Sequence, residues 1–169
     1  MVVIGWGLLA AAASGQTLTS LDVSGGSSLV FANLTLDPAF ALIETHANTP
    51  TALALEKPTS PGVVRLSLSQ INDTAAAWQG LEFGLTGGFF SSPPRGTFGG
   101  PAGSVQGQAA TSASLVQLVG VGVSLSVTFE LDMGSGTSGV LTVTPIVPEP
   151  ATGGWLLLTT LLLGGRRAG

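Results

Sequence analysis

The chain has 169 residues, enough for one domain with a modest core, and only 8% of them are charged, against about 25% in an average protein. Lys57, Arg65 and Arg95 are the only basic residues before position 166, so the sequence lacks the basic patch that nucleic-acid binding requires. Cysteine is absent, which excludes disulfides, thiolate metal sites and cysteine nucleophiles.

Residues 1–15 predict a signal peptide. Val2 to Ala13 form an uncharged apolar run of suitable length, and small residues after it allow cleavage before Ser14 or before Gln16. No lysine or arginine precedes the run, so either the true start lies upstream or the signal is weak. The alternative is a buried N-terminal strand or helix.

Residues 16–146 are expected to form the folded body, in which short apolar alternations predict strands with one buried face. Turn-forming residues separate these alternations, for example at Asp37-Pro38 and Gly87-Gly88. The alternating positions are Leu53 and Leu55; Val64, Leu66 and Leu68; Leu81, Phe83 and Leu85; and Leu141 and Val143.

Two stretches of the body interrupt this pattern. Asp73 to Gln79 is the one helical candidate, a short turn with Asn72 or Asp73 as its cap. Ser91 to Ser114 is rich in Gly, Pro and Ser, and we expect either a surface loop or a loop that contains a short strand around Val105 to Gln108.

The strongest strand signal is the sequence VGVGVSLSVTFELDM. Apolar residues occupy every second position from Val121 to Met133, with Gly, Ser, Thr, Glu and Asp between them. Strict alternation of this kind is typical of an antiparallel sheet. Together with the shorter alternations it predicts an all-β fold, a single-domain β-sandwich or jelly roll.

The sequence GSGTSG at Gly134 to Gly139 matches the glycine pattern of a phosphate-binding loop. Such a loop opens a helix, whereas Val140 to Val143 read as a strand. We therefore expect a hairpin loop between the last two strands.

Few residues of the body offer site chemistry. His46 is the only histidine, and we expect it to be an exposed loop residue. The alternative is that Glu44, which would lie on its side of an extended chain, pairs with it to orient a general base. Glu130 and Asp132 share the polar face of the long strand and are expected to be solvated charges that discourage edge pairing, with calcium binding as the alternative. We expect no metal, no cofactor and no catalytic residue.

Carbohydrate binding usually needs an exposed aromatic platform. The body contains one tryptophan, Trp78, and the pair Phe89-Phe90, of which one ring must point inward and one outward in a strand.

The last 23 residues read VPEPATGGWLLLTTLLLGGRRAG. A helix from Gly153 to Gly165 would span only about 20 Å, whereas a hydrocarbon core is about 30 Å thick. The prolines keep Glu149 extended, and the arginine pair would stay on the cytoplasmic side. The alternative is a terminal helix packed on the body.

Pro148-Glu149-Pro150, followed by Ala151, an apolar stretch and Arg166-Arg167, resembles the PEP-CTERM sorting signal of Gram-negative bacteria. The resemblance covers residues 147–169 and implies processing by exosortase, a membrane-integral, transpeptidase-like enzyme. It also implies association with extracellular polysaccharide and biofilm. By this resemblance, the recognition residues are Pro148, Glu149 and Pro150; the transmembrane segment is Trp155, Leu156, Leu157, Leu158, Leu161, Leu162 and Leu163; and Arg166 and Arg167 set its orientation.

We therefore expect an exported protein with a non-enzymatic body, held in the inner membrane before processing and then released or attached at the cell surface. A carbohydrate-binding module delivered by the same signal is the alternative. A secreted hydrolase is a third reading, and it requires a cleft in which His46 meets a carboxylate and a hydroxyl.

Overall fold

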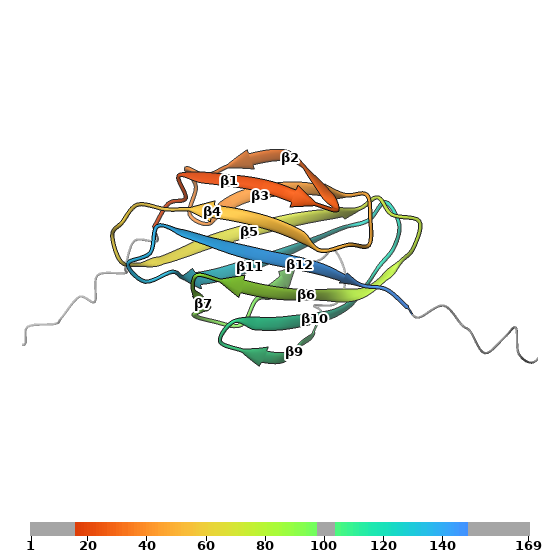
Figure 1. Ribbon diagram of the computed structural model, residues 1–169. Helices are drawn as coiled ribbons and strands as arrows, with labels where there is room; N and C mark the ends of the chain where they lie inside the picture. Colours follow the sequence, from red (N-terminus) through yellow and green to blue (C-terminus); the bar gives the residue numbers. More distant parts are fainter. Residues whose placement is uncertain (1–15, 98–103, 149–169) are drawn as a thin grey trace, which may run out of the picture.

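Twelve β-strands in two facing sheets build the part of the chain that the computed structural model describes, residues 16–97 and 104–148 (Figure 1). The first sheet has the order β1-β4-β12-β6-β10-β9, and the second has the order β2-β3-β5-β11-β7, with β8 also paired to β11. The strands are β1 (Ser20–Gly25), β2 (Ser27–Asn33), β3 (Ala39–Thr45), β4 (Thr51–Glu56), β5 (Val63–Asn72), β6 (Trp78–Thr86), β7 (Phe89–Phe90), β8 (Arg95–Thr97), β9 (Ser104–Ala109), β10 (Ser112–Val119), β11 (Ser124–Asp132) and β12 (Ser138–Ile146). The predicted all-β sandwich is confirmed.

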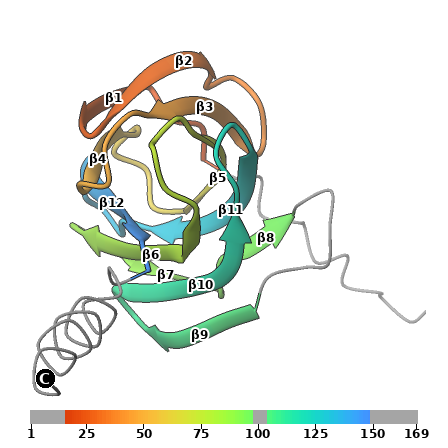
Figure 2. The same ribbon diagram turned by 90° about the vertical axis from the view of Figure 1, so that its right-hand side faces the viewer.

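The two sheets face each other in the end-on view (Figure 2), and the buried hydrophobic residues of both form one core between them. Because side chains alternate between the faces of a strand, every second residue points inward. The alternating positions predicted in β4, β5, β6 and β12 are all buried. Phe83 of β6 meets Phe129 of β11 edge to face, with ring centroids 5.0 Å apart, so this aromatic pair joins the two sheets.

One strand pair of the second sheet is parallel. β3 and β5 run side by side with Thr45 opposite Asn72, and β4, which lies between them in sequence, belongs to the opposite sheet. The chain therefore crosses the sandwich twice between these two neighbours. This arrangement brings the residues that follow β3 and β5 to the same end of the sheet.

The last strand is central in its sheet, between β4 and β6. It contains Pro145, whose missing N–H would disrupt a ladder with neighbours on both sides. The ladder with β4 ends at Val143, so Pro145 pairs only with β6, opposite Leu81. The proline is thus tolerated within a central strand.

The long predicted strand begins later than the alternation indicates. β11 starts at Ser124, and Val121 lies in the preceding turn with 55% of its surface exposed. Gly122 in this turn has a φ of +72°, a left-handed conformation that glycine adopts without steric cost. From Leu125 to Met133 the alternation predicts the buried face correctly.

The predicted helical turn at 73–79 is wrong. Residues 74–76 form a bend, and β6 begins at Trp78. The capping signal has a different cause, because the Asn72 side chain accepts the N–H of Thr74 at 3.1 Å in a local turn. Asn72 also donates to the carbonyl of Ala76 at 2.9 Å, which holds the segment as a bend.

Two further expectations need correction. Residues 134–137 do join the last two strands, but β11 and β12 lie in opposite sheets, so the connection crosses the sandwich and is not a hairpin. Glu130 and Asp132 do not protect an edge, because β11 has β5 on one side and β7 and β8 on the other.

The Gly- and Pro-rich stretch 91–114 contains strands. β8, β9 and the beginning of β10 lie within it, and β9 covers the expected short strand at 105–108. β9 forms an edge of the first sheet and pairs only with β10.

Candidate functional site

The predicted sorting residues begin at the end of the body. β12 ends at Ile146, and Val147 and Pro148 follow as exposed, non-strand residues. Glu149, Pro150, the predicted membrane segment and its arginine pair fall outside the described residues, as does the predicted signal peptide. Across residues 16–97 and 104–148, there is no helix with the length and apolarity needed to span a membrane.

In the body, His46 joins a hydroxyl and a carboxylate. Its Nε2 atom lies 2.9 Å from Oγ of Ser28, and its Nδ1 atom lies 3.0 Å from Oδ2 of Asp73. The connectivity is that of a Ser-His-Asp triad, in which one imidazole nitrogen contacts the nucleophile and the other contacts the acid. We call these three residues the Ser28 triad.

The strand order brings the Ser28 triad together. Ser28 lies on β2, His46 directly follows β3 and Asp73 directly follows β5, and these three strands are neighbours. Since Thr45 is opposite Asn72 in the parallel ladder, His46 and Asp73 are the next pair along it, and the N–H of Asp73 donates to the carbonyl of Thr45.

Sequence reasoning chose a different carboxylate. Glu44 lies opposite Ser28 in the β2–β3 ladder, whereas the carboxylate bonded to His46 comes from Asp73, 27 residues further on. The sequence marks Asp73 only as a possible helix cap, and no motif marks Ser28 as a nucleophile. The parallel pairing of β3 with β5, which the sequence did not predict, determines which carboxylate meets His46.

The hydrogen-bond chemistry fixes the direction of the proton chain. An ionised Asp73 only accepts, so Nδ1 of His46 carries the proton. In a neutral imidazole Nε2 is then the acceptor, and the hydroxyl of Ser28 donates to it. This is the tautomer in which a histidine acts as a general base for a serine.

The hydroxyl and the carboxylate that a secreted hydrolase requires do meet at His46, but on an open surface and not in the expected cleft. The side chains of His46 and Asp73 are 47% and 57% exposed. Water therefore competes with both hydrogen bonds, which contribute little to stability.

A buried polar network lies directly behind the Ser28 triad. Ser27 Oγ is 2.7 Å from Oγ1 of Thr45 and 2.6 Å from Oγ1 of Thr51, and Gln70 donates to Thr45 at 2.7 Å. The Oε1 atom of Gln70 is buried without a hydrogen-bond partner, whereas the three hydroxyls and the Gln70 amide N–H group are linked to one another. The network fixes β2 against β3 at the position where Ser28 and His46 meet.

The two carboxylates of β11 have structural partners. Glu130 lies 3.4 Å from Nε of Arg65, and Asp132 accepts the N–H of Gly134 at 2.7 Å. No group of three or more His, Asp or Glu side chains suited to a metal ion occurs in the described ranges.

The aromatic residues provide no tryptophan platform. Trp78 is fully buried, and its indole N–H donates to Asn48 at 3.0 Å. Phe90 is buried and Phe89 is 44% exposed, as expected for adjacent strand residues. The burial of Trp78 counts against carbohydrate recognition by this ring.

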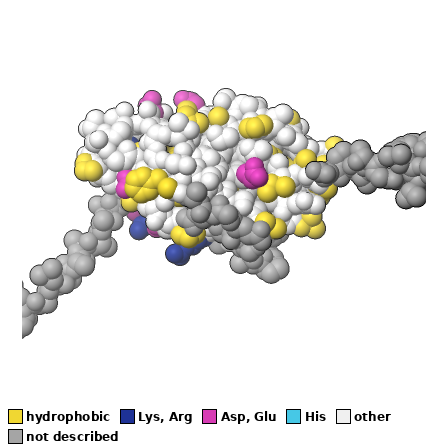
Figure 3. All heavy atoms as spheres, turned by 60° about the horizontal axis from the view of Figure 1, so that its bottom comes forward, with side chains coloured by type: hydrophobic (Ala, Val, Ile, Leu, Met, Phe, Trp, Pro, Cys, Tyr) yellow, Lys and Arg dark blue, Asp and Glu magenta, His cyan; other side chains and the backbone are white. Residues whose placement is uncertain are grey.

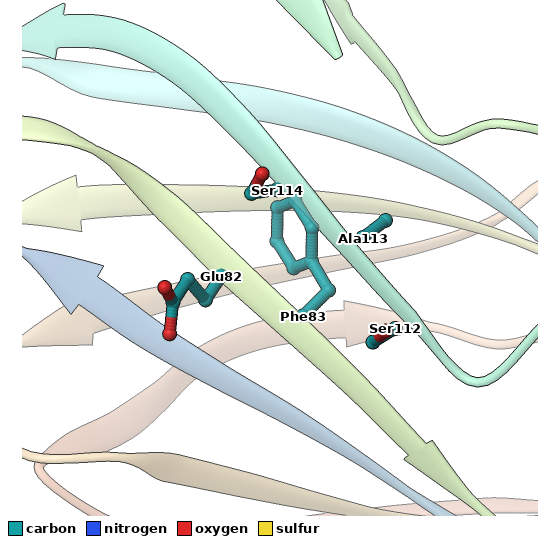
Figure 4. Close-up of a pocket in the computed structure, with 5 residues that line it drawn as sticks. All are labelled: Glu82, Phe83, Ser112, Ala113 and Ser114. Atoms are coloured by element: carbon teal, nitrogen blue, oxygen red, sulfur yellow. The ribbon is translucent and has the colours of Figure 1, made fainter. Parts of the chain in front are cut away.

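The outer face of the first sheet has shallow hollows. One, of about 300 Å³, is lined by Glu82, Phe83 and residues 112–114 of the paired strands β6 and β10 (Figure 4). Charged side chains are sparse on the molecular face in Figure 3, where hydrophobic side chains are scattered among polar ones. Neither feature gathers groups for catalysis as the Ser28 triad does.

Comparisons with protein-family models, with curated proteins and with solved structures find no match to this chain.

Proposed function

We propose that this chain is an exported cell-surface or extracellular-matrix protein whose C-terminal segment is a sorting signal processed by exosortase. The observation that carries the proposal is the order of parts after β12: an exposed end at Val147 and Pro148, then Glu149-Pro150, an apolar run and an arginine pair. The resemblance to the PEP-CTERM signal rests on this order.

The fold supports a removable tail. All the described strands end by Ile146, so cleavage near Pro148 would leave the described core intact. The extended Pro-Glu-Pro tripeptide would be the recognition element, the apolar run would hold the tail in the inner membrane, and Arg166 and Arg167 would set its orientation.

The body would then serve at the surface or in the matrix. Its few charges and many small hydroxyl side chains suit a polysaccharide-rich environment better than a nucleic acid or an acidic surface. Extracellular polysaccharide is therefore the surrounding material in which we place the released protein.

Replacing Pro148, Glu149 and Pro150 by alanine tests the proposal. In an exosortase-bearing host, we expect the uncut variant in the inner membrane and the wild-type protein released without its tail. A host without exosortase is the matched control, and it should leave both proteins uncut. Equal release of wild type and variant would refute the sorting assignment.

A reporter fusion tests whether the signals suffice. A reporter placed between residues 1–13 and 148–169 should reach the surface in the exosortase-bearing host. A fusion with Arg166 and Arg167 replaced by glutamate should lose correct orientation, since cytoplasmic basic residues set topology. Surface delivery of a reporter that lacks residues 148–169 would contradict the proposal.

A further inference from the structure

We propose that Ser28 is a nucleophile activated by His46 and positioned by Asp73, and that it accepts acyl groups from neutral carboxylic esters. The proposal is independent of the sorting signal and assigns a chemical activity to the body. It rests on the two hydrogen bonds of the Ser28 triad, at 2.9 Å and 3.0 Å.

The reaction follows from the proton chain. Oγ of Ser28 attacks the ester carbonyl carbon while its proton passes to Nε2 of His46. The bond from that carbon to the alkoxy oxygen then breaks, and the leaving alcohol takes the proton from Nε2. Water subsequently attacks the acyl-serine with His46 again as the base, releasing a carboxylic acid and restoring the hydroxyl.

Asp73 acts through His46. Its carboxylate holds Nδ1–H, which orients the ring and favours the imidazolium formed when the serine proton arrives. Asp73 is therefore a positioning residue.

The open edge of the second sheet supplies a backbone donor. In an antiparallel ladder, residues whose N–H groups point toward the partner strand alternate with residues whose N–H groups point away. The His46 N–H donates to the carbonyl of Gly26, which sets this alternation along β2. By that alternation the N–H of Leu29, three residues after Gly26, points away from β3. β2 is the terminal strand of its sheet. The N–H of the residue after Ser28 is thus directed away from the ladder, where it can stabilise the oxyanion of a tetrahedral intermediate.

Charge and exposure around Ser28 indicate the substrate class. Glu44 lies opposite Ser28 and Asp73 completes the triad, so two carboxylates disfavour an anionic ester. Val30, two residues after Ser28 and therefore on the same face of β2, is 53% exposed, as is Phe31, which contacts Phe40 on the outer face. These two side chains offer apolar surface to an acyl chain. A neutral ester with a short apolar acyl group satisfies both conditions.

The test uses the full chain in detergent with two neutral probes. An alkyl fluorophosphonate forms a stable bond to an activated serine, and peptide mass spectrometry locates it. Hydrolysis of p-nitrophenyl butyrate measures ester cleavage. We expect fluorophosphonate on Ser28, and we expect Ser28→Ala to abolish both the label and the ester cleavage above background.

Variants of the partners separate activation from simple exposure. His46→Gln should lower the labelling rate about 100-fold, the scale of general-base catalysis. Asp73→Asn should lower it by roughly 10-fold or more, because the neutral amide no longer stabilises the imidazolium and its NH2 group can hold the ring in the wrong tautomer. Asp73→Glu should restore part of the rate. Ser124→Ala removes an exposed strand serine outside the triad and should change nothing.

Far-ultraviolet circular dichroism, which reports the strand content, confirms that each variant folds. Two results overturn the proposal: a label on Ser28 no stronger than on Ser124, or labelling of Ser28 that His46→Gln leaves unchanged. Either result would leave the sorting signal unaffected, since its own test reads tail removal.

Discussion

The ammonium group of Lys57 lies 3.0 Å from the carbonyl oxygen of Gly134, 77 residues away in sequence. It also donates to the carbonyls of Pro58 and Ser60, at 3.2 Å and 2.8 Å, and the residue is only 3% exposed. A buried ammonium thus ties the loop after β4 to the loop between β11 and β12 through neutral carbonyls.

Lys57→Met should lower the free energy of unfolding by about 2 kcal/mol, because the buried ammonium loses its charge-assisted hydrogen bonds to three carbonyls. Urea denaturation followed by Trp78 fluorescence measures the change. Arg95→Met, at an exposed position, is the control and should leave the midpoint unchanged. If Lys57→Met and the wild-type protein have the same urea midpoint, the hydrogen bonds of Lys57 make no net contribution to the free energy of unfolding.

Asn72→Ala should be among the most destabilising polar substitutions in the body. The buried side chain donates to Ala76 and Val119 and accepts from the N–H and hydroxyl of Thr74. Its loss should lower the free energy of unfolding by about 3 kcal/mol.

Asn33 is the matched control for Asn72. It makes the same local turn, accepting the N–H and hydroxyl of Thr35, but at the surface. Asn33→Ala should cost less than about 1 kcal/mol, because water replaces its bonds. Equal thermal shifts for the two variants would contradict this assignment.

Two glycines of β6 should respond oppositely to alanine. A Cβ at Gly80 would lie 2.2 Å from the carbonyl oxygen of Leu115, so β6 and β10 would have to separate. A Cβ at Gly84 would meet nothing closer than Thr142, at 3.9 Å. We expect Gly80→Ala to cost about 2 kcal/mol and Gly84→Ala to be neutral or stabilising by about 0.5 kcal/mol. Thermal unfolding checks both, and a stable Gly80→Ala protein would mean that the strands adjust freely.

Phe129→Ala should cost about 3–5 kcal/mol, the range for truncating a buried phenylalanine. Its ring contacts Phe83 across the sandwich and Phe90 within its own sheet. Phe89→Ala removes a ring that is 44% exposed and should cost less than about 1 kcal/mol. The urea midpoints of the two variants measure this difference. Equal midpoints for Phe129→Ala and Phe89→Ala would show that the aromatic cluster is not the centre of the core.

Regular alternation predicted β11 and the buried faces of β4, β5, β6 and β12, because each buries large apolar residues on one side and small or polar residues on the other. β3 was not predicted because it begins with small residues on its buried face and large apolar residues on its outer face. Ala39 and Ala41 point inward while the larger Phe40 and Leu42 lie half-exposed on the outer face. β10 was missed because its register shifts between Val116 and Val119, which breaks the period of two.

The Ser28 triad could be predicted only in part. His46 stands out in the sequence as the sole histidine, and pairing with a carboxylate was the alternative to an exposed loop residue. Neither Ser28 nor Asp73 could be assigned, since each depends on which strands flank β3. The parallel pairing of β3 with β5 follows from packing across two sheets, and no local sequence signal specifies it.

The central position of β12 has a consequence for the order of assembly. A chain that crosses a membrane from its N-terminus delivers β12 last, yet β4 and β6 have no other strand between them. Both strands must wait with unpaired backbone groups until residue 146 has emerged. The Pro-Glu-Pro tripeptide begins two residues after Ile146. If the tail is the sorting signal proposed above, closure of the sandwich would coincide with the arrival of this tripeptide at the membrane surface.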